Sequence, residues 1–279
     1  MKRAEKTAAR MKPVWFPAGD RGLLLDLTGY GAQLGGLPPA EDRQALTRFA
    51  RALSQRIKKL QTAGQLDGIT DLVPGLASLL VHYDPLQISA VEVKKAVSII
   101  LEAPDDLAHT PARTWQLPVL YGAEAGPDLA EVASRCNMSE AQIIDLHAAT
   151  LLEVGIMGFL PGLAYMTGLH PSLHLPRRAE PRTHVAGGSV AIAMDQTVIY
   201  PLDSPGGWNL IGLMPIPLFD ARRHEPVLLK AGEHISFKPI QASEHKELQE
   251  AHYTYLKQSC GVKVNDLCFA HVAAAGNFS

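Results

Sequence analysis

Hydrophobic and polar residues follow one arrangement up to about residue 105 and a different arrangement afterwards. The first part has apolar runs of strand length and one longer stretch with apolar residues at three-and-four spacing. A second helix is predicted to begin at Ser89, where Ser-Ala-Val-Glu forms a capping box. The predicted elements are a strand at 22–27, a helix at 41–61, strands at 68–74 and 77–83, and the helix from Ser89. The order β-α-β-β-α predicts a small α+β domain over 13–105, with a split βαβ sheet and helices on one face.

A linker is predicted over 102–112, which contains two prolines and paired acids. After it come a strand at 114–121 and a helical pattern with a second capping box, from Ser139 to Gln142. Beyond Leu151 the helical period gives way to short β-rich pieces separated by Gly/Pro turns, which is typical of an antiparallel barrel or sandwich. The expected divisions are a disordered tail at 1–12, a β-barrel domain at 113–240, and a C-terminal extension with one outer helix at 241–279.

The β-rich part carries very little charge. Between Ala186 and Pro217 the only charged residues are Asp195 and Asp203. A strand with one solvated face alternates apolar and polar residues, and these pieces do not. We therefore expect several strands of the second domain to be buried on both faces.

Composition limits the class of protein. The chain has 279 residues, 47% of them hydrophobic and 19% charged, and a net charge of −2, so neither nucleic acid nor an anionic membrane surface is expected as a partner. The longest uncharged run, 154–176, is broken by Pro/Gly turns and does not fit a membrane helix. The three cysteines, Cys136, Cys260 and Cys268, form no CxxC motif, which favours a reducing, cytoplasmic location.

Several familiar catalytic motifs are absent from the sequence. There is no GxxxxGK[ST] or GxGxxG loop, and no lysine occurs between Ala96 and Leu229. This excludes a Walker-type nucleotide site, as well as a Schiff-base lysine in the turn-rich region. If the protein serves an ATP-driven reaction, we expect the nucleotide to bind elsewhere or on another chain.

Two pairs of polar residues are weak candidates for chemistry. His170 and His174 have the spacing of metal ligands on a helix, but Pro171 and Pro176 argue against a helix there, so no metal site is expected. Ser189 and Ser204 are possible nucleophiles without a G-x-S-x-G elbow. For Ser189 we favour a plain strand start after a glycine turn.

A cluster of arginines is the stronger signal. Arg177, Arg178 and Arg182 stand in a Pro-rich loop, within a region otherwise almost without charge. Guanidinium groups bind carboxylates and phosphates through two parallel hydrogen bonds, so the cluster is a candidate anion clamp. An exposed loop, or an ion pair with Asp195 or Asp203 that fastens the barrel, explains the cluster equally well.

Three aromatic residues lie next to glycine-containing turns and could line one pocket. They are Phe159 and Tyr165, on either side of a Pro-Gly turn, and Trp208, directly after Ser-Pro-Gly-Gly. Composition alone favours simple core packing for them.

Five short motifs occur together in the second half of the chain. They are GFLPGLAY at 158–165, PRRAEPR at 176–182, GSVAIA at 188–193, QTVIYP at 196–201 and SPGGW at 204–208. With these motifs the chain resembles the KipI family, also called allophanate hydrolase subunit 1, and within it most closely the 5-oxoprolinase subunits of the PxpB kind. The resemblance covers about residues 14 to 240. It implies an α+β N-terminal domain followed by a cyclophilin-like antiparallel β-barrel.

The resemblance also implies an activity and its partners. It implies a hydrolase subunit of an ATP-dependent 5-oxoprolinase, which converts 5-oxo-L-proline to L-glutamate only together with other chains. The implied partners are a related barrel subunit, like the 5-oxoprolinase subunit designated C or allophanate hydrolase subunit 2, and a protein like the 5-oxoprolinase subunit designated A. ATP would bind on a partner or at a shared interface. The alternatives are a KipI-like inhibitor of a sensor histidine kinase and half of a urea carboxylase-type carboxyltransferase.

The same motifs suggest a substrate site at the rim of the barrel. The expected binding residues are Tyr165, Arg177, Arg178, Arg182, Gln196, Gly206, Gly207 and Trp208. In this hypothesis SPGGW is a turn whose backbone amides face a small carboxylate-bearing substrate, beside an indole wall and the guanidinium groups. The sequence does not identify a catalytic residue. Ala191 and Met194 stand where the family has glycine, which predicts a narrower or reshaped pocket.

Overall fold

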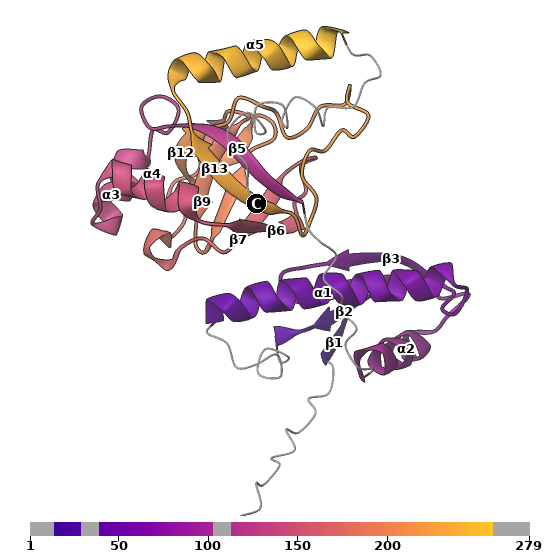
Figure 1. The fold of residues 1–279 in the computed structure, drawn as a ribbon. Coiled ribbons are helices and arrows are strands. Elements are labelled where there is room, and N and C mark those ends of the chain that lie inside the picture. Colours follow the sequence, from indigo (N-terminus) through magenta and orange to yellow (C-terminus); the bar gives the residue numbers. More distant parts are fainter. Residues whose placement is uncertain (1–13, 29–38, 103–112, 259–279) are drawn as a thin grey trace, which may run out of the picture. The chain divides into compact units, whose positions relative to one another are not determined.

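The protein divides into two compact units, Met1–Thr110 and Pro111–Ser279. The computed structural model describes residues 14–28, 39–102 and 113–258 (Figure 1). The tail expected at 1–12, most of the linker expected at 102–112, and the last part of the C-terminal extension, with Cys260 and Cys268, lie outside the described residues.

The first unit is a four-stranded antiparallel sheet with two helices. Its elements are β1 (Val14–Pro17), β2 (Gly22–Asp26), α1 (Pro39–Thr62), β3 (Ile69–Pro74), β4 (Ser78–Tyr83) and α2 (Ala90–Glu102). The strand order is β1-β2-β4-β3. Since β2 and β3 both run antiparallel to β4, which lies between them, they are parallel to each other and joined through α1. This is the predicted split βαβ arrangement.

The helices and strands of the first unit that the sequence predicted are those with a buried apolar face. The apolar stripe of α1, which includes Leu53 and Ile57, packs into one core with the buried side chains of the sheet and of α2. The Ser89–Glu92 capping box that begins α2 is present, with Ser89 N donating to Glu92 Oε2 at 2.9 Å. Strand β1 was not predicted. It is a four-residue edge strand, VWFP, that ends in a proline and is mostly exposed, so it shows no alternation of buried and exposed positions that would mark it as a strand.

The second unit is a closed seven-stranded barrel with helices beside it. Its strands are β5 (Thr114–Tyr121), β6 (Leu152–Met157), β7 (Ala164–Thr167), β8 (Arg182–Val185), β9 (Ser189–Ala193), β10 (Gln196–Ile199), β11 (Ser204–Gly206), β12 (Asn209–Leu213) and β13 (His234–Pro239). The helices are α3 (Leu129–Cys136), α4 (Glu140–Ala149), the short η2 (Pro171–Leu173) and α5 (Ala242–Gln258). The barrel order is β10-β7-β6-β13-β5-β12-β9, and β9 pairs with β10 to close it.

The barrel is confirmed, but it is not antiparallel throughout. Strands β13 and β5 pair in parallel, and the other barrel pairs are antiparallel. A parallel pair needs a long connection, and here the whole of the rest of the barrel lies between the two strands in sequence. Periodicity within single strands carries no information about this direction, so the sequence could not reveal it.

The charge-poor strands are buried on both faces, as predicted. All residues of β9 and β10 are buried. Alternate side chains such as Ile192 and Ile199 point into the barrel core, while Ala191, Val198 and Tyr200 belong to a second cluster on the outer face. That outer cluster is covered by the β8–β11 ribbon, the two-stranded antiparallel sheet formed by β8 and β11. Because the ribbon covers the outer face of β9 and β10, these strands carry apolar residues on that face as well as on the inner one.

Helix α4 packs against the barrel, mainly on β13. It begins at the predicted capping box, in which Ser139 and Gln142 bond each other's backbone. Its His147 is fully buried among three barrel strands, stacked 4.6 Å from Phe237, with Nδ1 2.7 Å from the Tyr121 hydroxyl. Burial lowers the pKa of His147 to about 3. Over the described residues, no helix combines the length and apolarity needed to span a membrane.

Candidate functional site

A cavity of about 220 Å³ lies between the outer wall of the barrel and the β8–β11 ribbon. Drug-sized ligand pockets are larger, so this volume suits a small molecule. The cavity is lined by Phe159, Leu160, Leu163, Tyr165, Arg177, Arg178, Pro181, Val198, Tyr200, Ser204, Pro205, Gly206, Gly207 and Trp208. The sequence placed the site at the rim of the barrel. In the structure the cavity lies on the outer face, because Val198 of β10 and Tyr200, which directly follows β10, point away from the barrel interior.

The SPGGW motif builds one wall of this cavity. Its first three residues are not a turn but strand β11, in which Gly206 lies opposite Arg182 of β8. The next residue, Gly207, accepts a hydrogen bond on its carbonyl oxygen from Arg178 N at 2.7 Å. Gly206 lies directly against the ring of Tyr200, where a side chain would collide. The glycines therefore allow the ribbon to approach the barrel wall closely.

Trp208 serves both as core and as cavity wall. Only 6% of it is exposed, and it packs in the outer-face cluster with Leu163 and Leu210. Its indole meets Tyr165 edge-on, with ring centroids 5.9 Å apart, and the Arg177 guanidinium lies 5.5 Å from the indole centroid. Such an arrangement holds a cation at the edge of an apolar wall. The sequence left open whether Trp208 packs in a core or lines a pocket. In the structure it does both.

Tyr200 adds a polar group that sequence reasoning did not single out. Burial raises the pKa of its phenol, while the nearby Arg177 and a backbone hydrogen bond from Trp208 lower it in part. The group is therefore a neutral hydroxyl near pH 7, able to donate to a bound carbonyl. Ser204, considered above as a nucleophile, also lines the cavity, and its hydroxyl has no hydrogen-bond partner within the described part of the chain.

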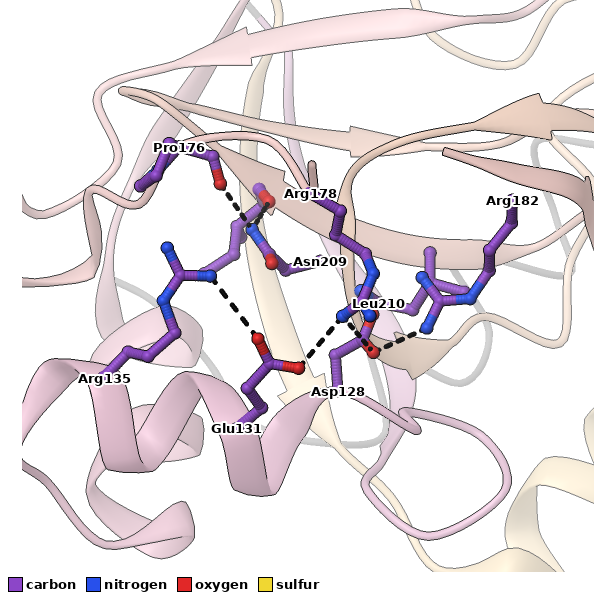
Figure 2. A network of polar contacts seen from close by, with 9 residues as sticks. Asp128, Glu131, Arg135, Pro176, Arg178, Arg182, Asn209 and Leu210 are labelled. Atoms are coloured by element: carbon purple, nitrogen blue, oxygen red, sulfur yellow. Dashed lines mark hydrogen bonds and ion pairs between the residues drawn. The ribbon is translucent and has the colours of Figure 1, made fainter. Parts of the chain in front are cut away.

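Two of the three predicted arginines are engaged by acids of the chain itself. Figure 2 shows Arg178 and Arg182 converging on Asp128, at 3.0 Å and at 2.6 Å, and Arg178 also reaching Glu131 at 3.0 Å. An internal ion pair was one of the sequence alternatives, but its acids were expected to be Asp195 or Asp203. That expectation is wrong for Asp203, which accepts hydrogen bonds from Gly187 N and pairs with His184. Asp128 is far away in sequence, so spacing gave no hint of it.

Arg177 is the remaining cation of the cavity. None of the ion pairs among the described residues involves it, and its guanidinium rests on the Trp208 ring. Arg178 lines the cavity as well, but its charge is balanced by Asp128 and Glu131. Arg182 is not among the lining residues. An anionic ligand in the cavity would therefore meet its countercharge at Arg177.

The other expected site positions lie away from the cavity. Gln196 is buried at the opposite end of β10, paired with Ala193 and Thr167. Ala191 is buried in the outer-face cluster without lining the cavity. Met194 occupies the first position of the two-residue β9–β10 loop, with φ of 55°. Glycine suits that position because the backbone has a positive φ there, and not because a ligand needs the space.

The histidine pair does not form a metal site. His170 Nδ1 accepts a hydrogen bond from Ser172 N, and His174 Nε2 lies 2.8 Å from the carbonyl oxygen of Leu169. Among the residues that the structure describes, no group of three His, Cys, Asp or Glu side chains could hold a metal ion. Ser189 is buried at the start of β9, as the plain interpretation predicted.

With this geometry in place, the comparisons assign the chain to a class. Residues 17–229 match the family described as "Carboxyltransferase domain, subdomain C and D". The chain therefore belongs to this carboxyltransferase domain family, which confirms the family resemblance found in the motifs.

The chain is also similar to individual proteins of known sequence or structure. The chain is 39% identical to the 5-oxoprolinase subunit designated B of Escherichia coli O157:H7 over 189 residues, which are 67% of this chain and 86% of that protein. It is 32% identical to the protein of the same designation from Bacillus subtilis (strain 168) over 226 residues, or 75% of this chain and 94% of that one. The crystal structure of TTHA0988 superposes with a TM-score of 0.63 at 32% identity. That match covers 80% of this chain but 40% of TTHA0988, so the chain spans less than half of that protein.

Proposed function

We propose that this chain is a subunit of an ATP-dependent 5-oxoprolinase, which hydrolyses 5-oxo-L-proline to L-glutamate, and that the cavity behind the β8–β11 ribbon binds the cyclic substrate. The observation that carries the proposal is a small cavity whose lining cation, Arg177, has no carboxylate partner among the described residues. The likeness to proteins named as 5-oxoprolinase subunits supports the substrate.

The chemistry of the cavity suits that molecule. 5-Oxoproline carries one carboxylate, a lactam carbonyl and a small apolar ring. In the proposal Arg177 pairs with the carboxylate, and the ring packs against Tyr165 and Trp208. The Tyr200 hydroxyl and the backbone of Gly206 and Gly207 supply donors for the carbonyl, whose oxygen gains negative charge as water adds to the amide.

ATP and the remaining catalytic groups are assigned to partner chains. The sequence has no phosphate-binding loop and no lysine between Ala96 and Leu229. In the proposal the partners are a related barrel subunit, of the kind designated C in 5-oxoprolinases or called allophanate hydrolase subunit 2, and a protein like the 5-oxoprolinase subunit designated A, acting together in the cytoplasm. In the proposal ATP binds on a partner or at a shared interface, and its hydrolysis drives the opening of the lactam there.

The test is reconstitution with such partners and measurement of ATP-dependent glutamate formation from 5-oxo-L-proline. Arg177→Ala should raise KM about 10- to 150-fold, the cost of a charge-assisted hydrogen bond worth about 1.5–3 kcal/mol. Arg113→Ala is the matched control, because its guanidinium also lies over an indole, 5.2 Å from the Trp115 centroid, but outside the cavity. KM in this control should stay within about twofold of wild type.

Two outcomes would contradict the proposal. An active complex in which Arg177→Ala and Arg113→Ala behave alike would remove Arg177 from the substrate site. An inactive wild-type complex, together with tight binding of the chain to the dimerisation domain of a sensor histidine kinase, would favour the regulatory alternative instead.

A further inference from the structure

Asp128 is a buried carboxylate whose bonds are unusual for its position. It is the N-cap residue of α3, where an aspartate normally accepts a hydrogen bond from the first turn of its own helix. Here the side chain makes no capping bond. Only 5% of the side chain is exposed, and Figure 2 shows it facing Arg178 and Arg182.

The carboxylate joins two segments that form the cavity. Its Oδ1 accepts from Arg178 Nη1 at 3.0 Å and from Arg182 Nη2 at 2.6 Å. Its Oδ2 accepts from Leu210 N at 2.7 Å. Arg178 follows Arg177 directly, and Leu210 lies two residues after Trp208. One carboxylate therefore fastens the arginine segment 177–182, which carries the guanidinium of the cavity, and the start of β12, which directly follows the indole of Trp208.

Further bonds make this arrangement sensitive to the charge on Asp128. Arg178 N also donates to the carbonyl oxygen of Gly207, and Arg182 lies opposite Gly206 in the ribbon. Arg182 Nη1 is already buried without a hydrogen-bond partner in the described part of the chain. Removal of the carboxylate charge would leave two adjacent guanidinium groups without their buried counter-ion, a change that is costly in a protein interior. The exposed Glu131 pairs with Arg178 and Arg135, and no ion pair with Arg182 is formed by it among the described residues, so it could not replace Asp128.

We propose that Asp128 is a positioning residue that, through Arg178 and Arg182, sets the place of Arg177 and of the ribbon at the cavity and thereby determines how tightly the substrate carboxylate is held. The claim that Asp128 affects how tightly the substrate is held rests on the proposed 5-oxoprolinase function. The claim that Asp128 fixes the position of the segment 177–182 is independent of that function.

The kinetic test uses Asp128→Asn in the reconstituted complex. The amide oxygen can still accept from Leu210 N, but the amide group loses the charge that pairs with both guanidiniums. KM for 5-oxo-L-proline should rise about tenfold, with kcat within about threefold of wild type, because the ground-state and transition-state contacts of the carboxylate are weakened alike. In the double variant Asp128→Asn/Arg177→Ala, KM should be within about twofold of Arg177→Ala alone, since Asp128 acts through Arg177.

The matched control is Glu131→Gln, which removes the other acid at 3.0 Å from Arg178. Its side chain is 51% exposed, so KM should change less than about twofold. If the increases in KM from Asp128→Asn and Arg177→Ala multiply in the double variant, or if Asp128→Asn leaves KM unchanged, the positioning role is refuted.

A second readout needs no substrate. Trypsin cuts after arginine, and the segment contains Arg177, Arg178 and Arg182. Cleavage of native chain within this segment should be about tenfold faster in Asp128→Asn than in wild type, while cleavage elsewhere in the second unit stays unchanged. Faster cleavage at all sites alike would show general destabilisation and refute the local role. If wild type shows no 5-oxoprolinase turnover but the cleavage result holds, only the proposed function fails.

If Asp128→Asn does not fold, Arg182→Gln tests the same connection from the other side. This variant keeps the Asp128 pair with Arg178 and removes the shorter of the two contacts. The same selective tryptic cleavage after Arg177 and Arg178 is expected, about threefold faster or more. An unchanged cleavage pattern in a folded Arg182→Gln protein would overturn the inference.

Discussion

Replacement of Gly206 by alanine is the most direct test of how the ribbon meets the barrel wall. A Cβ at Gly206 would lie against the Tyr200 hydroxyl, and within 2.8 and 2.9 Å of two atoms of its ring. Tyr200 is only 6% exposed and packs in the outer-face cluster, so its ring has little room to withdraw. The ribbon or the ring must therefore move.

The cost of this change follows from the loss of packing. Inserting a methyl group into a well-packed region typically costs about 1–3 kcal/mol. For a domain of this size that corresponds to a decrease in Tm of about 2–12 °C. Thermal and urea unfolding of Gly206→Ala, followed by tryptophan fluorescence and far-UV circular dichroism, would measure it. KM of the reconstituted complex should also rise, because Tyr200 lines the cavity.

The neighbouring glycine supplies the control. A Cβ at Gly207 would meet its nearest atoms, those of the Pro181 ring, at 3.5 Å, an ordinary contact distance. Gly207 has no positive φ, so alanine is compatible with its backbone. Gly207→Ala should therefore leave the free energy of unfolding within about 0.5 kcal/mol of wild type. Equal destabilisation by the two substitutions, or none by Gly206→Ala, would refute the close approach of the ribbon to Tyr200.

Two further predictions concern stability. Met194→Gly should raise the free energy of unfolding by about 0.5–1 kcal/mol, because a left-handed conformation is unfavourable for methionine at φ of 55°; a lower urea midpoint would contradict this. His147 has a folded-state pKa of about 3 against an ordinary 6.5, so the unfolded chain binds its proton first and stability falls as pH drops from about 6.5 toward 4. The slope of unfolding free energy against pH should be lower in His147→Gln by about 1 kcal/mol per pH unit, and identical slopes would show that His147 is not buried in its neutral form.

Much of the candidate site could be anticipated from the sequence, because the motifs keep cavity residues close together along the chain. Tyr165, Arg177 and Trp208 were expected at one pocket, and all three line the cavity. Tyr200 was hidden because it directly follows the apolar strand β10, where alternation could not show which face was covered. Asp128 was hidden by distance, since it pairs with arginines 50 and 54 positions later. Long-range ion pairs have no local signal.

The sequence by itself determined most of the helices and strands and the fold class, but not, for example, β1 or β11. The periods of its apolar residues, its glycine and proline turns, and the capping boxes at Ser89 and Ser139 are local properties, and each acts within a few residues. Only the tertiary structure decided the parallel pairing of β13 with β5 and the covering of the barrel's outer wall by the ribbon. It also decided which arginine is left for a ligand, because Asp128 comes from a distant segment and neutralises Arg178 and Arg182 but not Arg177. These outcomes depend on which surfaces meet when the chain closes, and no short stretch of residues contains that information.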